Sequence, residues 1–370
     1  MKVAFVNLTG GGLSGGSRKT MTRLLPQLLQ EPDVQIKLFL HPRMDIFSSE
    51  SGLECYLWPE KDHLRGYPAL KNAIRQYQPD IVFIPNSILP DFGNVPTVIM
   101  VRNMEVLTRP VGGNKLRQAA KNLLRRYLFK RSCRKATRVI AVSQFVKEYL
   151  IEKWHIAQEK IDVVYHGIDA EESKPVKPQK LQCMDTDKFI LSSGSFVSYR
   201  GYEDAIKSFA AASLADTSLI LAGDVKGDDK YIKKIRHMIK ALGMESKIIL
   251  PGFLSQSEMS WCYANCSIFV MTSRIEACPN VVLEALSFGC VNISTLSPPM
   301  PEIFASAAQY YNPGDIDQLK ELLVICNNLN EATRKKYSGT AKERAACFSW
   351  KKNSSNLINI LKNVLRLHAK

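Results

Sequence analysis

The sequence lacks any long uninterrupted run of apolar residues. A helix needs about 20 of them to cross a bilayer, and no stretch of the 370-residue chain approaches that length without charges. The first apolar run, Val3–Leu8, leads into glycines and is too short for the core of an export signal, so we interpret it as a β-strand. We therefore expect a cytoplasmic protein, and leave open peripheral binding to the inner face of the cell membrane.

Cysteines in paired or metal-binding spacing are also missing. The nine cysteines are odd in number and scattered along the chain. In a protein without an export signal, this pattern favours reduced thiols with mostly structural roles. The sequence therefore predicts no disulfide framework.

Acidic residues are absent from residues 114–138, although this segment holds ten Lys or Arg of a chain with formal charge +15. Its apolar residues share one face of a helical wheel, and they are Leu116, Ala119, Ala120, Leu123, Leu124 and Tyr127. The cationic patch that we single out consists of Lys121, Arg125, Arg126 and Lys130. Two interpretations stay open: the helix lies on an anionic membrane surface, or its apolar face packs on a sheet. Nucleic-acid binding ranks third, because no aromatic stacking platform accompanies the charge.

Short β-branched runs alternate with helical patterns, which is typical of parallel-sheet α/β architecture. The alternation stops at residues 171–187, a proline-rich and charged stretch that we interpret as a linker. We predict two Rossmann-like, doubly wound domains, at 1–170 and 188–349, with a last helix at about 350–370 returning to the first. Strands are predicted at 3–8, 34–40, 81–85, 97–101, 139–142, 161–165, 188–193, 219–222, 247–250, 268–271 and 291–294. Ligands bind at the carboxyl ends of such strands, so we expect the domains to face each other across an active-site cleft.

A glycine-rich loop containing Gly15 and Gly16 follows the first predicted strand. Glycines at that place let the backbone approach a phosphate at a helix N-terminus. No Gly-Lys-Ser/Thr follows, so the loop is not a Walker loop. The second strand lacks the acidic residue of a dinucleotide site, which weakens a nicotinamide-dependent function.

Two glutamates mark the other candidate site. Glu276 follows the strand predicted at 268–271, and Glu284 lies on the apolar helix that comes next. A carboxylate inside an apolar helix needs a partner or a ligand to offset its desolvation. Ribose hydroxyls would suit Glu284.

At these residues the sequence resembles a known family. Glu276-x7-Glu284, with Ala277 and Pro279 between, is similar to the signature of the retaining glycosyltransferases of family four, which have the GT-B fold. Further similar segments run in the family's order along the chain, and they are Gly10–Gly16, Ala141–Ser143, Tyr165–Asp169, Leu221–Asp224, Gly252–Phe253, Tyr263–Ala264, Ser273, Pro301–Glu302 and Phe348–Trp350.

The resemblance implies roles for particular residues. Glu276 and Arg200 would be catalytic, with Glu276 on the hydroxyls of the transferred sugar and Glu284 on the ribose. The implied donor-binding residues are Gly15, Gly16, Ser195, Arg200, Arg274, Cys278, Pro279, Asn280 and Glu284. On the acceptor side, Arg102 or Asn103 takes the place where relatives carry a histidine. The leaving diphosphate would itself accept the acceptor's proton, and no metal or other cofactor is expected.

The phosphate clamp departs from the family pattern. Ser195 stands where Arg is usual and Arg200 where Lys is usual, so one positive charge is missing. Arg200 can bind two diphosphate oxygens at once, and Arg274 could replace the missing charge. An Asp185-Thr186-Asp187 triplet resembles the metal motif of another glycosyltransferase architecture, but it lies in the predicted linker.

The function expected is therefore transfer of a sugar from a UDP- or GDP-sugar to a lipid-linked or glycan acceptor, in cell-surface polysaccharide or lipopolysaccharide biosynthesis. The expected partners are the donor, a glycan or polyprenyl-linked acceptor and an anionic membrane surface, and no nucleic acid. Two alternatives stay open: a sugar-nucleotide epimerase of similar fold, and a basic nucleic-acid-binding protein.

Overall fold

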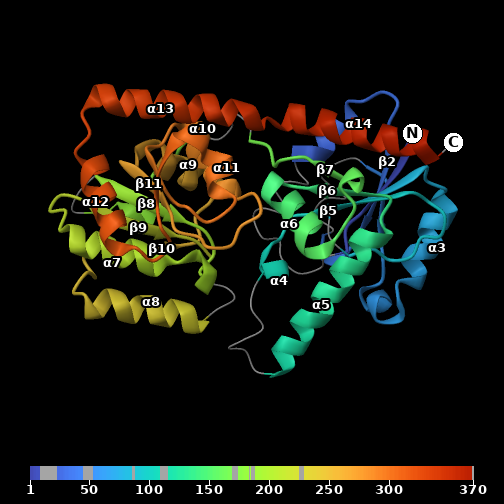
Figure 1. Cartoon of the computed structure of the whole chain (residues 1–370), viewed down its shortest axis with the longest axis horizontal. Coiled ribbons are helices and arrows are strands. Elements are labelled where there is room, and N and C mark those ends of the chain that lie inside the picture. Colours follow the sequence, from blue (N-terminus) through green and yellow to red (C-terminus); the bar gives the residue numbers. More distant parts are fainter. Residues whose placement is uncertain are drawn as a thin grey trace. The chain divides into compact units, whose positions relative to one another are not determined.

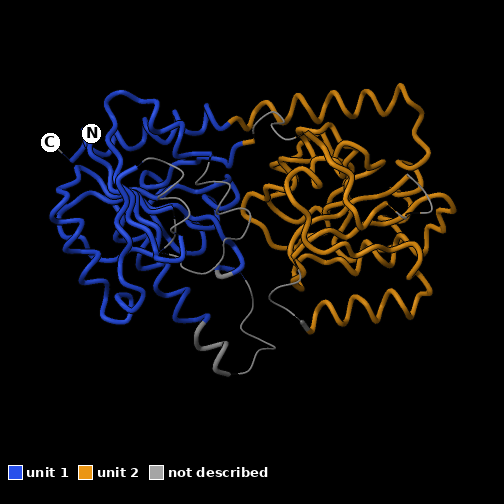
Figure 2. The backbone as a smooth tube through the Cα atoms, turned by 180° about the vertical axis from the view of Figure 1, so that it is seen from behind, with its two compact units in different colours: residues 1–167, 350–370 blue, residues 168–349 orange. Residues whose placement is uncertain are grey.

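The computed structural model describes residues 1–8, 23–44, 53–85, 88–108, 116–168, 174–182, 184, 188–224 and 229–368. The chain divides into two compact units, shown in Figures 1 and 2. Unit 1 comprises Met1–Gly167 together with Trp350–Lys370, and unit 2 comprises Ile168–Ser349. The segment predicted as a linker, residues 171–187, is counted in unit 2, and residues 171–173, 183 and 185–187 of it lie outside the described residues.

Unit 1 contains a seven-stranded sheet in which all neighbouring strands run parallel. Its strands are β1 (Lys2–Val6), β2 (Gln35–Leu40), β3 (Cys55–Leu57), β4 (Ile81–Ile84), β5 (Thr97–Val101), β6 (Arg138–Ala141) and β7 (Ile161–Val163). The spatial order is β3-β2-β1-β4-β5-β6-β7. Strand order thus reverses between β1 and β4, as it does in doubly wound folds.

The helices of unit 1 include one from the end of the chain. Those with defined bounds are α3 (Pro68–Tyr77), α4 (Glu105–Thr108), α5 (Leu116–Lys135), α6 (Gln144–Trp154) and α14 (Trp350–His368), and the described residues 23–29 are also helical. Buried residues recur along α14 at spacings of three and four, from Trp350 to Val364, so one face of this helix packs on unit 1. A Cβ at Gly167 would lie 2.5 Å from the Trp350 ring, which shows how closely the start of α14 is packed.

Unit 2 contains a six-stranded parallel sheet in the order β10-β9-β8-β11-β12-β13. Its strands are β8 (Phe189–Ser193), β9 (Ser218–Ala222), β10 (Ile248–Gly252), β11 (Ile268–Met271), β12 (Asn292–Thr295) and β13 (Ala308–Tyr311). Its helices are α7 (Tyr202–Ala212), α8 (Asp229–Ala241), α9 (Gln256–Asn265), α10 (Asn280–Phe288), α11 (Met300–Phe304), α12 (Ile316–Asn327) and α13 (Glu331–Ala345).

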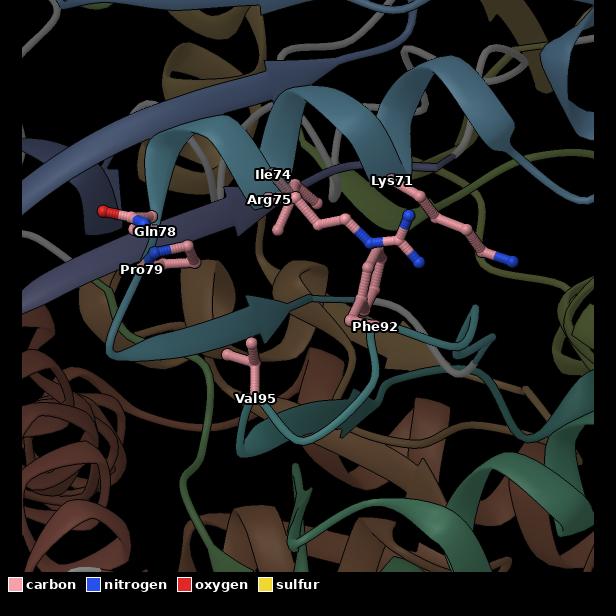
Figure 3. A pocket seen from close by; sticks show the side chains of 7 residues that line it. All are labelled: Lys71, Ile74, Arg75, Gln78, Pro79, Phe92 and Val95. Carbon is pink, nitrogen blue, oxygen red and sulfur yellow. The ribbon is translucent and has the colours of Figure 1, made fainter.

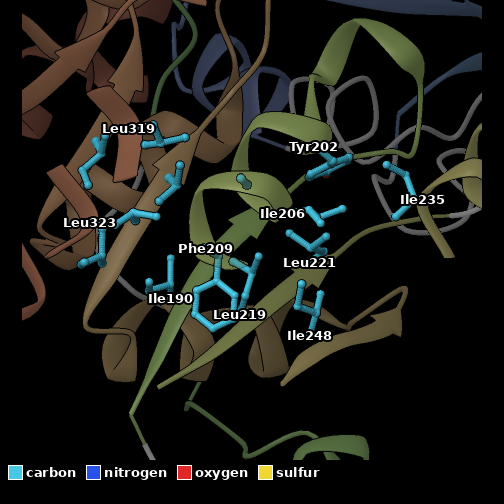
Figure 4. Close-up of a cluster of buried hydrophobic side chains, with 14 of the residues drawn as sticks. Ile190, Tyr202, Ile206, Phe209, Leu219, Leu221, Ile235, Ile248, Leu319 and Leu323 are labelled. Atoms are coloured by element: carbon cyan, nitrogen blue, oxygen red, sulfur yellow. The ribbon is translucent and has the colours of Figure 1, made fainter. Parts of the chain in front are cut away.

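Both faces of the unit 2 sheet are buried. On one face, Ile190 and Ile268 belong to an apolar cluster completed by side chains of α7, α8 and α12 (Figure 4). On the other face, the Phe189 ring stacks on Trp261 of α9. Successive strand residues point to opposite faces. This explains why β8 and β11 are apolar without alternation, as parallel strands covered on both sides usually are.

The strands predicted at 97–101 and 268–271 are confirmed to the residue as β5 and β11. The helix whose wheel groups Leu116 to Tyr127 is confirmed as part of α5, which continues to Lys135. The sequence analysis did not predict β3, β13, α3, α12 or α13. None of the described helices is both long enough and apolar enough to cross a bilayer.

A close backbone approach joins two strand ends in unit 2. The Gly194 N–H donates to Ala222 O at 2.9 Å, and the next residue after Ala222 is Gly223. A Cβ on Gly223 would lie 1.8 Å from Gly194 O. Only glycine therefore fits at position 223, and the contact fixes the backbone just beyond β8.

We expect Gly223→Ala to lower the free energy of unfolding by about 1–3 kcal/mol, because the blocking atom belongs to the backbone and cannot rotate away. The matched control is Gly339→Ala in α13, where an added Cβ meets no atom within 4 Å. That change should raise stability by about 1 kcal/mol, the difference in helix propensity. Urea unfolding followed by circular dichroism measures both, and a Gly223→Ala protein as stable as the parent would contradict the steric argument.

Candidate functional site

The candidate site lies where the strand order of the unit 2 sheet reverses. β8 and β11 are neighbours, with Ile190 opposite Ile268 and Leu191 opposite Phe269. Because the strands are parallel, the segments that follow Ser193 and Met271 leave the same edge of the sheet side by side. Ligands of doubly wound folds bind at such a switch point, beyond the carboxyl ends of the strands.

A buried ion pair joins these two segments. Arg200 ends a 3-10 turn at Ser198–Arg200, and its Nη1 lies 2.6 Å from Oε1 of Glu276 in the loop after β11. The two side chains are only 16% and 12% exposed. The same Nη1 donates to the Ser273 hydroxyl at 3.3 Å. Burial raises the pKa of Glu276 above its usual value, and the charge of Arg200 opposes that rise.

The guanidinium of Arg200 rests against the backbone of Gly194. A Cβ at Gly194 would lie 2.9 Å from the guanidinium carbon, and the residue has a φ of +141° that disfavours other side chains. The Nε of Arg200 is buried and donates no hydrogen bond to a described residue. Arg200 therefore retains a buried donor besides the Nη1 that faces Glu276 and Ser273.

Glu284 is held by a short chain of hydroxyl groups. It lies on α10 and is 9% exposed. Its Oε2 accepts a hydrogen bond of 2.9 Å from the Tyr263 hydroxyl, which lies 3.0 Å from the hydroxyl of Ser193 at the end of β8. Burial and the neighbouring Glu284 raise the pKa of Tyr263 well above its usual value, so this phenol stays protonated and donates.

The N-terminus of α10 borders the same loop. Cys278 and Pro279 are buried, and Asn280 is the first helical residue. No side chain caps this end of the helix, and the buried Oδ1 of Asn280 accepts no hydrogen bond from a described residue. Free backbone N–H groups and the helix dipole make such an end favourable for anions.

Arg274 is engaged elsewhere. The sequence analysis suggested that it could replace the missing charge of the phosphate clamp. Its Nη2 instead donates to both carboxylate oxygens of Asp204, at 2.8 and 3.0 Å. Asp204, on α7, is 3% exposed. Sequence reasoning missed Asp204, because it lies in no recognisable motif. It placed Tyr263 within the family pattern but gave it no role at the site.

The remaining predicted residues are divided among several places. Ser195 is exposed. In unit 1, Arg102 is half-buried, while the Asn103 side chain accepts a hydrogen bond of 2.8 Å from the Glu105 N–H at the start of α4. Gly15 and Gly16 lie outside the described residues, as do Asp185 and Asp187 of the acidic triplet.

Helix α5 is only partly packed. Phe129 and Cys133, in its C-terminal half, are buried. In contrast, Leu123, Leu124 and Tyr127 are 53%, 58% and 64% exposed. The apolar face predicted from the helical wheel therefore does not pack on the sheet at these three residues. Of the cationic patch, Arg125 is exposed, Arg126 and Lys130 are half-buried, and the side chain of Lys121 lies outside the described residues.

A cavity of about 330 Å³ lies in unit 1, beside the amino ends of the strands of its sheet (Figure 3). Its lining includes Lys71 and Arg75 of α3, Pro79 just before β4, and Phe92 and Val95 before β5. These residues lie at the amino ends of the strands, and no predicted site residue is among them. Its position does not correspond to the usual ligand edge of a doubly wound fold.

Two families of known proteins match the sequence. Residues 15–172 match the family described as Glycosyltransferase Family 4, and residues 173–344 match Glycosyl transferases group 1. The protein belongs to family 4 of the glycosyltransferases, as the sequence motifs predicted.

Among curated relatives, an N-acetylgalactosamine-N,N'-diacetylbacillosaminyl-diphospho-undecaprenol 4-alpha-N-acetylgalactosaminyltransferase of Campylobacter jejuni is 25% identical over 241 residues. The alignment covers 61% of this chain and 60% of that protein. The chain spans between 37% and 60% of the length of four such relatives.

Solved structures share the fold. A glycosyltransferase from Rickettsia africae ESF-5 has a TM-score of 0.78 at 17% identity, with 98% of each chain covered. HepE (Alr3699) from Anabaena, in complex with UDP, has a TM-score of 0.76 at 17% identity, covering 98% of this chain and all of that one. These likenesses confirm the predicted GT-B class, with two Rossmann-like domains.

Proposed function

We propose that the protein is a retaining glycosyltransferase that moves a sugar from a UDP- or GDP-sugar to a lipid-linked or glycan acceptor. The observation that carries this proposal is the buried Arg200–Glu276 pair at the switch point of unit 2. It joins a phosphate-binding cation to a carboxylate that can bind sugar hydroxyls. The N-terminus of α10 adds a favourable site for negative charge beside them.

In this proposal, the diphosphate of the donor replaces Glu276 as the partner of Arg200 when the donor binds. Arg200 pairs with Glu276 in the structure, and the buried Nε of Arg200 donates to none of the residues that the structure describes. A diphosphate would take over the guanidinium, which binds two oxygens at once. Glu276 would then be free to accept hydrogen bonds from the sugar. Hydrogen bonds from sugar hydroxyls would stabilise the ionised form of Glu276, which burial disfavours by raising the pKa.

The chemistry is a substitution at the anomeric carbon. The bond between this carbon and the diphosphate oxygen breaks, and a bond to the acceptor hydroxyl oxygen forms on the same face. The proton of the hydroxyl passes to the leaving diphosphate. Arg200 stabilises the negative charge that develops on that group, so positioning and electrostatics supply the catalysis.

Glu284 is proposed to accept hydrogen bonds from the ribose of the donor. Tyr263 occupies its Oε2 and fixes the orientation of the carboxylate. A carboxylate that is oriented in advance loses little conformational entropy on binding. Because HepE was solved with UDP in a chain of the same fold, a uridine donor is a reasonable first choice.

The acceptor is proposed to be polyprenyl-linked, in the biosynthesis of a cell-surface polysaccharide. The Campylobacter jejuni relative acts on a diphospho-undecaprenol substrate, according to its name. Helix α5 exposes Leu123, Leu124 and Tyr127 beside the exposed Arg125. Apolar side chains among cations are typical of helices that lie on anionic membranes.

The roles of the two glutamates can be separated with a panel of UDP-, GDP- and ADP-sugars. Glu276→Ala should abolish transfer and slow donor hydrolysis, while the fold remains intact. Glu284→Ala should mainly weaken nucleotide binding, by roughly 1.5–3 kcal/mol for lost charge-assisted hydrogen bonds. Glu343→Gln, an exposed glutamate of α13, is the matched control. Near-normal turnover by Glu276→Ala would refute the assignment of the site, and release of free nucleotide with an epimerised sugar would favour an epimerase.

Metal independence is proposed as well, because Arg200, backbone N–H groups and the dipole of α10 can together balance the diphosphate. We therefore expect donor hydrolysis and transfer to continue unchanged in excess EDTA. Complete loss of activity, restored by Mn²⁺ or Mg²⁺, would point to a metal site and draw attention to Asp185 and Asp187.

Vesicle sedimentation tests the membrane role of α5. The protein should bind anionic vesicles at low salt and neutral vesicles weakly, since each near-surface cation contributes about 1 kcal/mol. Gln at Lys121, Arg125, Arg126 and Lys130 should reduce this binding and leave donor hydrolysis unchanged. Gln at four exposed cations of unit 2, Lys233, Lys240, Lys335 and Lys336, removes the same charge elsewhere and serves as control. Equal losses in both variants would mean that net charge, and not α5, attracts the membrane.

A further inference from the structure

Asp204 is a buried carboxylate with partners on two sides. On one side, Arg274 of the loop after β11 donates to both of its oxygens. On the other side, its Oδ2 accepts hydrogen bonds from the Tyr311 hydroxyl at 3.2 Å and from the Gly314 N–H at 3.0 Å. Asp204 thus connects α7 both to the candidate site and to the end of β13.

The Arg274 side of this network lies within the candidate site. Arg274 is two residues before Glu276, and its N–H donates to Tyr199 O at 2.8 Å, next to Arg200. The Thr272 hydroxyl donates to Arg200 O at 2.6 Å. The loop that carries Glu276 is therefore joined at several points to the turn that carries Arg200.

Glycine at position 201 makes room for this arrangement. Gly201 links the Arg200 turn to α7, and it has a φ of +64°. A Cβ there would lie 1.9 Å from Nη1 of Arg274, so the guanidinium passes directly over the Gly201 backbone on its way to Asp204. The ion pair consequently crosses the segment that sets the position of Arg200.

Stability alone is a weak explanation for such a pair. The side chain of Asp204 is 5% exposed and that of Arg274 is 36% exposed. An ion pair that is only partly desolvated contributes little net stability, because solvent screens the attraction and desolvation offsets much of the rest. An ion pair can instead matter to the reaction rate by fixing the positions of reacting groups, because misplacing such a group by about 1 Å can cost roughly a hundredfold in rate. The spacing of Arg200 and Glu276 is the geometry at stake here.

We propose that Asp204 is a positioning residue which, through Arg274, holds the Glu276 loop against the Arg200 turn. It touches neither donor nor acceptor in this role. This inference rests on the proposed function, since it concerns the same site. It assigns to Arg274 an intramolecular carboxylate as its partner, in place of the donor's diphosphate.

Three single variants separate positioning from simple stabilisation. Arg274→Gln removes the link to the loop, and Asp204→Asn removes the charge that holds Arg274. Tyr311→Phe is the matched control, because it removes a different hydrogen bond of Asp204 and leaves Arg274 in place. The full-length proteins are compared in hydrolysis of the UDP- or GDP-sugar that the parent hydrolyses fastest, and by hydrogen exchange of peptides covering 272–279.

We expect Arg274→Gln and Asp204→Asn to lower kcat by roughly 10- to 100-fold. The donor KM should change by less than about threefold, because the diphosphate contacts remain. The backbone N–H of residue 274, which in the parent is bonded to Tyr199 O, should exchange faster in both variants than in the parent. Tyr311→Phe should leave kcat and this exchange near the parental values, even if its urea midpoint falls.

Other outcomes overturn the inference. If kcat falls in proportion to the urea midpoint across all three variants, Tyr311→Phe included, Asp204 is merely structural. If KM rises at constant kcat in Arg274→Gln, Arg274 binds the donor directly. If the parent protein hydrolyses none of the UDP-, GDP- and ADP-sugars, or if Glu276→Ala has normal turnover, the result counts against the proposed function instead. In that case the exchange of the Arg274 N–H still decides whether Asp204 holds the loop.

Discussion

The pairing of β8 with β11 is the constraint on which the candidate site depends. Parallel strands that are neighbours end at one edge, so the Arg200 turn and the Glu276 loop emerge together although they lie far apart in the sequence. Gly194 and Gly223 hold the backbone beyond β8 so closely that no larger residue fits at 223. Apolar burial on both faces of the sheet in turn keeps these strands in register.

Among the described residues of unit 2, three buried carboxylates lie in or beside the candidate site, and the difference between their partners indicates their roles. Asp204 is bound by Arg274, a tyrosine hydroxyl and a backbone N–H. Glu284 accepts from a phenol whose pKa is raised, so that bond persists across the ordinary pH range. Glu276 pairs with Arg200, whose guanidinium has a further buried donor. Since a buried charge must keep a partner, a ligand can replace the partner of Glu276 more readily than those of Asp204.

The sequence was sufficient to predict the two doubly wound domains and the two glutamates of the candidate site, because strand periodicity and the Glu276-x7-Glu284 spacing are local patterns. The outermost strands of the two sheets and the partners of individual side chains were harder to predict. The strands β3 and β13 are short, and Ala308–Tyr311 carries no β-branched residue. The engagement of Arg274 by Asp204 could not be predicted, since it depends on the turn at Gly201 bringing α7 beside the loop. The helical wheel placed Leu123 and Leu124 on one apolar face of α5. It could not predict that both are exposed, because burial depends on the neighbouring elements that pack against the helix.

The positive charge of the chain also has to be explained, and the candidate site accounts for little of it. Ser195 supplies no cation there and Arg274 is neutralised by Asp204, which leaves Arg200 as the described cation that a diphosphate could claim. Ten of the Lys and Arg residues lie instead in segment 114–138 of unit 1, without any acidic residue. Like charges crowded on one helix repel each other, and exposing two leucines and a tyrosine among them adds an apolar cost. A surface that is anionic and partly apolar would reduce both the charge repulsion and the cost of the exposed apolar side chains, and a lipid headgroup layer has that chemistry.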